Sequence, residues 1–566
     1  MWKYIKPFRI QALTGFIFKI IEAFFELLVP IVVASIIDDG IALNDRHYVI
    51  KMGIVLIVFA IVGYCCALVC QYFASKTSQA FGTYLRNDLY KKINALDFSQ
   101  LDEIGSSSLI TRMTNDINQL ELAVAMIIRL VSRSPFIIIG SFFMAFRIDA
   151  KLSIVFLMTA PVLAFIIYYF MSRTIPMYVK IQKQLDAISL ICRENLSGMR
   201  VIRAFCKQEE EKKRFHDSVN RQKDMQIGTS QLASLLNPMT SVVVNMGILV
   251  ILYVGALRVQ GGFVLQGDVV ALIHYLNQIL LSMIVFANVI VILNKAAASY
   301  QRVCDVLNLE PEIVDGYSES SDLDDSIVFD HVGFHYAHSH VLSDVSFSIA
   351  KGETVGIIGG TGCGKTTLMH LLMRFYDVSE GKIMFHGREL CDYPLAWLHQ
   401  KISLVFQDVS LLKGTIRENL CLGKKDISDE CLWQALDIAQ GQFVKELEQG
   451  LDSEIVQDGK NLSGGQRQRL TIARSLVQNP EVLILDDSMS ALDFATEAAL
   501  RKALMSMDMT KIIVSQRLSS LKHADKIIVL SHGEVVGIGS HRDLMESCQI
   551  YQEIAASQMV EEDDYE

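Results

Sequence analysis

The sequence has no excess of basic residues. Its 566 residues include 52 Lys and Arg against 62 Asp and Glu, which gives a formal net charge of −10, and no basic tail offsets this balance. The composition argues against a nucleic-acid partner, because nucleic-acid-binding surfaces are strongly basic. A cysteine framework is missing too, since the 11 cysteines are scattered along the chain. They are expected to be reduced thiols of a membrane and cytosolic protein.

A cleavable signal peptide is not expected, because the first apolar run is too long and lacks a small-residue cleavage site. The sequence is rich in apolar residues instead: 51% are hydrophobic and the mean hydropathy is +0.32. These values are high for a soluble enzyme and predict a membrane portion.

Six apolar segments in the first half approach the roughly 20 residues that span a bilayer. They lie near residues 12–37, 52–74, 124–146, 152–171, 233–257 and 269–293. Basic residues precede the first segment, whereas the loop after it is mainly acidic, so the N-terminus is predicted to be cytosolic. The connections after the second and fourth segments are long and helical in pattern, and are expected to project into the cytosol.

The second long connection contains a break at Glu194–Phe205. It predicts a turn helix that docks on another domain, although a solvated helical hairpin without a partner stays open. The first apolar segment contains Lys19, Glu22 and Glu26. One hypothesis is that Glu26, and also Glu22, contact cationic or polar cargo in a cavity; the alternative is that Lys19 pairs with Glu22 and all three stabilise packing.

The hydropathy falls after about Asn294, and residues 316–325 form a polar, acidic stretch typical of a linker. The predicted organisation is a six-helix all-α membrane domain at 1–310, a linker at 311–325 and an α/β domain at 326–566.

The α/β domain contains a glycine-rich stretch, Gly359 to Thr366, that fits GxxxxGK[ST] between a β-branched run and a helical run. Its backbone N–H groups can converge on phosphate oxygens, with Lys365 on the terminal phosphates and Thr366 on Mg²⁺. Residues 482–487 predict a buried strand that ends in two carboxylates, as a Mg²⁺ ligand and a catalytic base require. Residues 462–466, Leu-Ser-Gly-Gly-Gln, begin a helix whose amides can bind a second phosphate group.

These motifs, in this order, resemble an ATP-binding cassette (ABC) transporter, specifically an exporter half-transporter whose membrane domain precedes one nucleotide-binding domain. The resemblance covers nearly the whole chain and implies ATP and Mg²⁺. It implies ATP contacts at Tyr336, which stacks on adenine, and at Gly359, Gly360, Thr361, Gly362, Cys363, Gly364, Lys365, Thr366, Thr367 and Gln407. It places Mg²⁺ at Thr366, Gln407 and Asp486, and assigns a site on the partner to the signature and D-loop residues Leu462, Ser463, Gly464, Gly465, Gln466 and Asp493. It suggests coupling helices near Ser106–Arg112 and near Ser197–Arg203, the second with Ser197, Gly198 and Arg200.

Two positions depart from the family pattern. Asp487 stands where the family has its catalytic glutamate, and Gln516 stands where it has its switch histidine. Aspartate is shorter by about 1.5 Å, and glutamine cannot carry the charge of an imidazole. The sequence therefore looks like the subunit of a heterodimeric exporter that holds the degenerate, slowly hydrolysing site, and whose intact signature completes the site of a partner with glutamate and histidine.

The expected function is ATP-driven export of hydrophobic or amphipathic small molecules, of the multidrug type, from the cytosol across a bacterial cell membrane. Two alternatives stay open: export of a peptide or lipid by the same machinery, and a non-transporting role as an ATP-gated regulator.

Overall fold

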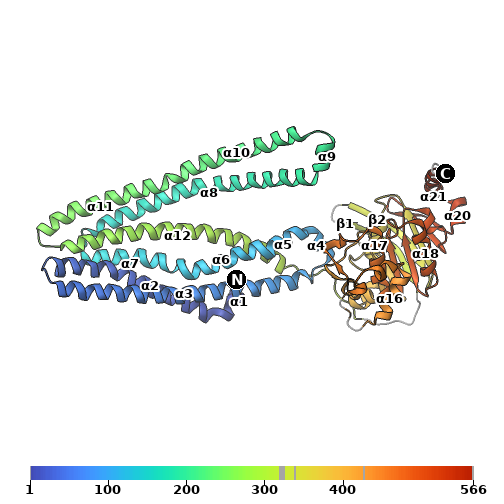
Figure 1. Ribbon diagram of the computed structural model, residues 1–566, viewed down its shortest axis with the longest axis horizontal. Helices are drawn as coiled ribbons and strands as arrows, with labels where there is room; N and C mark the ends of the chain where they lie inside the picture. Colours follow the sequence, from blue (N-terminus) through green and yellow to red (C-terminus); the bar gives the residue numbers. More distant parts are fainter. Residues whose placement is uncertain (1, 318–325, 337–338, 423, 425–426, 564–566) are drawn as a thin grey trace. The chain divides into compact units, whose positions relative to one another are not determined.

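The computed structural model describes residues 2–317, 326–336, 339–422, 424 and 427–563. The predicted linker at 311–325 therefore falls partly outside the described residues. The chain forms two compact units: residues 1–94 with 105–309, and residues 95–104 with 310–566. Figure 1 labels the elements of both units.

The first unit is helical and has six stretches that are long and apolar enough to cross a membrane. They span Lys3–Ile41, Arg46–Ile93, Ser106–Ile148, Ser153–Ser197, Gln208–Gln260 and Gln266–Leu307. The six predicted segments lie in these stretches, so the all-α membrane domain is confirmed. Its elements are α1 (Trp2–Ile5), η1 (Lys6–Phe8), α2 (Arg9–Ser35), η2 (Ile36–Ile41), α3 (Arg46–Ile93), α5 (Ser106–Thr111), η3 (Arg112–Asp116), α6 (Ile117–Met126), η4 (Ile127–Val131), α7 (Arg133–Ile148), α8 (Ser153–Ser197), α9 (Met199–Ala204), α10 (Gln208–Ser234), α11 (Leu236–Gln260) and α12 (Gln266–Leu307).

The core of this unit forms around α12, which packs against α2, α7, α8 and α11. Tyr275 of α12 is fully buried, and its hydroxyl donates to the Leu27 carbonyl of α2 at 2.7 Å. By contrast, Ile54, Ile57 and Ile61 of α3 are all more than half exposed, as side chains that face lipid would be.

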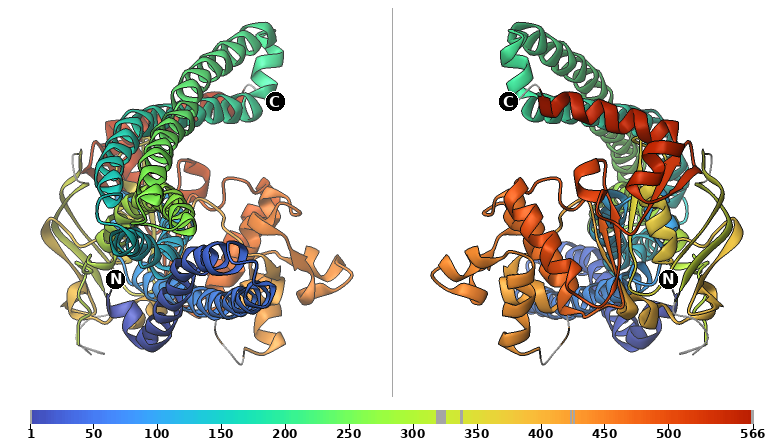
Figure 2. Two further views of the ribbon diagram at one scale, coloured as in Figure 1. Left: turned by 90° about the vertical axis from the view of Figure 1, so that its left-hand side faces the viewer. Right: turned by 90° about the vertical axis from the view of Figure 1, so that its right-hand side faces the viewer.

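The second long connection is a helical hairpin in which α8 and α10 run side by side, with Gln184 of α8 donating to the hydroxyl of Ser218 of α10 at 2.9 Å. The short helix α9 lies at its tip (Figures 1 and 2). The turn helix predicted in Glu194–Phe205 is therefore present. Three apolar side chains at this tip are exposed: Leu196 by 75%, Val201 by 60% and Phe205 by 72%.

The second unit contains a six-stranded sheet in the order β12-β11-β3-β10-β9-β6 and a four-stranded antiparallel sheet in the order β2-β1-β4-β5. The strands are β1 (Ile327–Tyr336), β2 (Ser339–Ile349), β3 (Thr354–Gly359), β4 (Glu380–Phe385), β5 (Arg388–Glu389), β6 (Ile402–Val405), β7 (Gly414–Thr415), β8 (Glu454–Ile455), β9 (Val482–Asp486), β10 (Thr510–Val514), β11 (Lys526–Ser531) and β12 (Glu534–Gly539). The helices are α4 (Phe98–Ile104), α13 (Lys365–Leu372), α14 (Leu395–Lys401), α15 (Ile416–Cys421), α16 (Asp429–Ile438), α17 (Gly464–Val477), α18 (Phe494–Met505), α19 (Leu518–Leu521), α20 (His541–Ser547) and α21 (Gln549–Asp563). The predicted α/β phosphate-loop fold is confirmed.

Strands β3, β6, β9, β10 and β11 pair in parallel, and only β12 runs against them in this sheet. Val514 of β10 is in register with both Ile357 of β3 and Asp486 of β9. The carboxyl ends of these three strands therefore meet at one edge, where ligands of open α/β sheets bind.

Residues 95–104 belong to the second unit although they follow the long membrane helix α3. The ring of Phe98 lies 4.4 Å from that of Phe375, and the hydroxyl of Tyr376 donates to Asp102 at 2.6 Å. The first coupling helix was predicted near Ser106–Arg112, and this position stays a prediction; the segment that packs within the second unit is residues 95–104. Gly105, at φ 77°, ends it, and the residues after Gly105 belong to the first unit.

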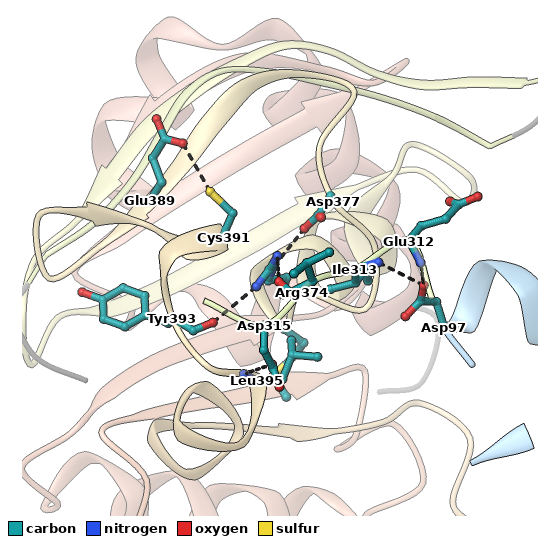
Figure 3. Close-up of polar contacts among 12 residues, drawn as sticks. Asp97, Glu312, Ile313, Asp315, Arg374, Asp377, Glu389, Cys391, Tyr393 and Leu395 are labelled. Carbon is teal, nitrogen blue, oxygen red and sulfur yellow. Dashed lines mark hydrogen bonds and ion pairs between the residues drawn. The ribbon is translucent and has the colours of Figure 1, made fainter. Parts of the chain in front are cut away.

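A buried arginine ties the start of the second unit together (Figure 3). Arg374 donates to the Val314 carbonyl at 2.9 Å, to the Tyr393 carbonyl at 3.3 Å and to Asp377 at 2.9 Å. Asp97, just before α4, accepts from the backbone N–H of Ile313 at 3.1 Å. The described part of the linker is thus held by Arg374, just after α13, on one side and by residues 95–104 on the other.

Candidate active site

A cleft of about 200 Å³ opens at the carboxyl edge of β3, β9 and β10. It brings together four regions that lie far apart in the sequence: the glycine-rich loop, Gln407, the Asp486–Asp487 pair and the loop at Gln516. Its wall consists of Val341, Thr361, Gly362, Gly364, Lys365, Thr366, Thr367, Gln407, Asp486, Asp487, Val514, Ser515 and Gln516.

The glycine-rich loop depends on glycine at specific positions. Gly362 and Gly364 have φ values of 77° and 101°, which side chains rarely tolerate. A Cβ at Gly359 would lie 2.2 Å from the Leu530 carbonyl oxygen of the neighbouring strand. Lys365 begins α13, and its ammonium donates to the carbonyls of Gly359 at 2.9 Å and Gly360 at 2.7 Å. The loop is therefore a compact ring of backbone amides with a cation across it, a shape suited to phosphate.

Tyr336 ends β1 beside this loop. Its hydroxyl lies 3.4 Å from that of Thr367, and its ring meets Tyr376 edge-on with centroids 5.4 Å apart. This arrangement places an aromatic ring next to the start of α13, where the resemblance expects the adenine.

Asp486 ends β9 and is 3% exposed. Burial raises the pKa of its carboxyl, while a hydrogen bond from Thr366 and the charge of Lys365 oppose that rise. The Thr366 hydroxyl, the Gln407 amide and this carboxylate supply oxygen donors of the kind that Mg²⁺ binds. The donor set present in the cleft therefore fits Mg²⁺, whose charge would stabilise the ionised carboxylate.

Asp487 has a left-handed backbone, with φ 45°, and its N–H donates to the Val514 carbonyl at 2.9 Å. Its carboxylate and Gln516 both line the cleft. Burial and the neighbouring Asp486 raise its pKa, while Arg517, Lys365 and the Gln516 N–H oppose the rise. The two departures from the family pattern therefore lie in the same cleft.

Sequence reasoning missed a residue that holds the Gln516 loop. Gln558 of the C-terminal helix α21 donates to the Gln516 carbonyl at 2.7 Å and accepts from the Leu518 N–H at 2.7 Å. Each bond joins residues about forty positions apart in the sequence, and Gln558 belongs to no recognisable motif.

The signature lies apart from the cleft. Ser463 caps α17: its hydroxyl accepts from the Gln466 N–H at 3.3 Å, and the Gln466 side chain accepts from the Ser463 N–H at 2.9 Å. Asp493 caps α18 by accepting from the Thr496 backbone N–H at 2.9 Å. Within the described chain, none of Leu462, Ser463, Gly464, Gly465, Gln466 and Asp493 lines the cleft.

The predicted coupling residues lie at the turn between α8 and α9. Ser197 ends α8 and donates to the Arg193 carbonyl at 2.9 Å, Gly198 separates the two helices, and Arg200 is exposed on α9. A contact with another domain stays a prediction.

The two membrane carboxylates predicted to contact cargo are both in ion pairs. Lys19 donates to Glu22 at 2.8 and 2.9 Å, which is the pair that the packing alternative expected. Arg133 of α7 donates to both oxygens of Glu26 at 2.8 Å, a pairing across helices that sequence reasoning missed. Cargo contact by Glu22 or Glu26 stays a prediction.

Comparison with known proteins agrees with this architecture. Residues 12–283 match the family described as ABC transporter transmembrane region, and residues 342–490 match the family described as ABC transporter. The chain is 34% identical over 558 residues to the uncharacterised ABC transporter ATP-binding protein YfiB of Bacillus subtilis, covering 98% of this chain and 97% of that protein. It is 28% identical to an ATP-dependent lipid A-core flippase of Sodalis glossinidius, covering 98% and 96%. The solved structure of a bacterial Atm1-family ABC exporter with ATP bound superposes with a TM-score of 0.80 at 21% identity, covering 97% of this chain and 98% of that one.

Proposed function

The chain belongs to the ABC transporter family and is an ATP-driven exporter with its membrane and ATP-binding domains in one polypeptide; from this premise we propose that it is the degenerate-site subunit of a heterodimeric exporter. The observation that carries the proposal is the composition of the cleft. Lys365, Thr366 and Asp486, which bind phosphate and Mg²⁺ in the family, lie together with Asp487 and Gln516. The cleft thus keeps its binding groups and lacks both usual catalytic side chains.

The geometry at Asp487 supports slow hydrolysis. A general base must reach the attacking water, and the aspartate side chain is shorter by about 1.5 Å than the glutamate of the family. Gln516 offers an amide where an imidazole would supply charge. ATP bound here, with Mg²⁺ held by Thr366, Gln407 and Asp486, acts as a long-lived clamp between subunits.

The signature supports a role toward a second chain. Ser463 and Gly464 are exposed and away from the cleft, on a capped helix whose first amides are available to a phosphate. A partner half-transporter with glutamate and histidine would place its own ATP there. The exposed apolar tip at Leu196, Val201 and Phe205 is a second surface suited to such a partner.

The proposed cargo is a hydrophobic or amphipathic small molecule, moved out of the cytosol of a bacterium across its plasma membrane, with the N-terminus and the ATP-binding domain cytosolic. Export of a lipid is the second candidate, and its support is the lipid A-core flippase, which matches this chain along its length.

Transport into inverted membrane vesicles tests the proposal. We expect ATP-dependent uptake of a hydrophobic dye when this chain is produced with a half-transporter that has glutamate and histidine at the two positions, and little uptake with either chain alone. Uptake by this chain alone at the rate of the pair would contradict the heterodimer. Absence of uptake from every pair, with ATP binding intact, would favour the non-transporting regulator.

A further inference from the structure

The charges inside the membrane helices do not cancel. Lys19 neutralises Glu22, and Arg133 neutralises Glu26. Arg129, one helical turn before Arg133, is left over. Its Nε is buried without a hydrogen-bond partner, as is the Nε of Arg133, but unlike Arg133 it makes no ion pair among the described residues. The start of the third apolar segment therefore carries a guanidinium without a counter-ion among the described residues.

Arg129 belongs to the same cluster as the two ion pairs. The neighbouring Ile128 packs against α2, where a Cβ at Gly15 would lie 3.0 Å from it. Gly15 lies one helical turn before Lys19 on α2, so Ile128, next to Arg129, packs beside the turn of α2 that carries Lys19. The cations of α2 and of the η4–α7 stretch thus converge on one region.

The depth of the cluster suits a headgroup. Arg129 lies five residues inside the predicted segment 124–146, about 8 Å from its cytosolic end at 1.5 Å per residue. Lys19 lies about 10 Å inside the first segment by the same measure. An unpaired cation at this depth is costly, and such residues usually mark a ligand path.

Apolar surface lies on the same set of helices. A pocket of about 520 Å³ lies among α7, α8 and α12, with Ile138, Ile167, Met171, Phe286 and Ile290 in its wall and no charged side chain among its described lining residues. Its volume falls within the roughly 300–1,000 Å³ of ligand pockets. Helix α7 contributes Ile138 to this pocket and Arg133 to the charged cluster.

We propose that Arg129 is an anion subsite of the membrane domain, which binds the carboxylate or phosphate headgroup of an amphipathic substrate while the pocket among α7, α8 and α12 takes up its hydrocarbon chain. The planar guanidinium matches both oxyanions with paired N–H donors. The inference rests on the proposed export function and gives it a substrate class. Glu22 and Glu26 alone would predict a cationic substrate. The proposed headgroup is anionic instead, because Lys19 and Arg133 already pair with those two carboxylates.

Ligand binding to the full-length chain in nanodiscs, measured by calorimetry without ATP, tests the subsite. Four probes share a twelve-carbon chain: laurate, dodecyl phosphate, dodecanol and dodecyltrimethylammonium. We expect Arg129→Gln to weaken the binding of laurate or dodecyl phosphate by about tenfold and to leave dodecanol unchanged. The anion with the larger loss identifies the headgroup. Arg129→Lys should keep part of the affinity.

Arg147→Gln is the matched control, because it removes the same charge about 27 Å farther along the same membrane-crossing stretch and should bind all probes as the wild type does. Equal binding of laurate by the wild type and Arg129→Gln would overturn the subsite, as would preferred binding of dodecyltrimethylammonium. Loss of pairing with a second half-transporter without loss of anion binding would make Arg129 an interface residue instead. The assay needs no hydrolysis, so failure of the two-site ATPase scheme would leave its result unchanged.

Discussion

The cleft and the signature surface are parts of one domain, but they differ in what each lacks. The cleft has its phosphate loop and its Mg²⁺ donors, whereas the positions of the base and the switch hold Asp487 and Gln516. The signature surface has its full Leu-Ser-Gly-Gly-Gln sequence on a capped helix, and none of these residues is among the described residues that line the cleft. The cleft needs a signature from a second chain, and the signature surface needs a phosphate loop with a catalytic base and a switch residue from that chain.

This difference assigns different consequences to damage in the two places. A change at the signature should affect chemistry on the partner's ATP, while a change at Asp487 should affect a site that already hydrolyses slowly.

The largest effect is expected at the signature. In the assembled pair, Ser463→Arg should lower ATP turnover by about 100-fold, because it removes groups that stabilise charge on the partner's phosphate. Asp487→Asn should change turnover by less than about twofold, since its site contributes little. A colorimetric phosphate assay on both variants decides, and a larger loss from Asp487→Asn would reverse the assignment of the two sites.

The second-largest effect is expected from chemical modification of the phosphate loop. Cys363 is buried beside Lys365, with Sγ 3.6 Å from the ammonium. A bulky maleimide on this thiol should weaken ATP binding by more than about tenfold, because it fills the ring of amides. Cys431, which is exposed, serves as the control thiol. Mass spectrometry that shows Cys363 modified with ATP binding intact would contradict the expectation.

A smaller effect is expected from the C-terminal helix. Gln558→Ala removes two hydrogen bonds to the backbone of the Gln516 loop, so amide exchange at Leu518 should quicken by about fivefold to tenfold. Gln549→Ala is the matched control, since on the same helix Gln549 contacts Glu553 at 3.0 Å and not the loop. Unchanged exchange in Gln558→Ala would show that the loop is held by other contacts.

The smallest effect concerns pH. Burial raises the pKa of Asp486, so the folded chain keeps that proton to higher pH than the unfolded chain, and the cost of ionising the carboxyl on folding is larger at pH 7 than at pH 4. Asp486→Asn should therefore raise the Tm of the nucleotide-free protein at pH 7 by about 2–4 °C, and by less at pH 4. Asp493 near the signature shows the opposite case, because its hydrogen bonds to Thr496 lower its pKa. Asp493→Asn should lower the Tm at pH 7. Equal changes in Tm for Asp486→Asn and Asp493→Asn would contradict the expected difference between the cleft and the signature surface.

The features predictable from the sequence are local ones. A strand, a glycine turn and a helix follow one another at 353–374, so one motif specifies the loop, its conformation and Lys365. The six membrane helices follow from runs of apolar residues. Contacts between residues far apart in the sequence could not be predicted. Arg133 pairs with Glu26 across 107 positions, and Gln558 bonds Gln516 across 42. The packing of residues 95–104 into the second unit was not predictable for the same reason, because their contacts are with Phe375 and Glu312.

The most direct test of the account is ATP turnover by the purified full-length chain without a partner, compared between the wild type, Asp487→Glu, Gln516→His and the double variant. Binding of ATP by all four should be similar, because Lys365, Thr366 and Asp486 are unchanged. We expect the wild type and each single variant to hydrolyse ATP very slowly, and the double variant to be faster by about tenfold or more, because a base and a switch that act together give back activity only together. Brisk turnover by the wild-type chain alone would contradict the degenerate site and the heterodimer with it.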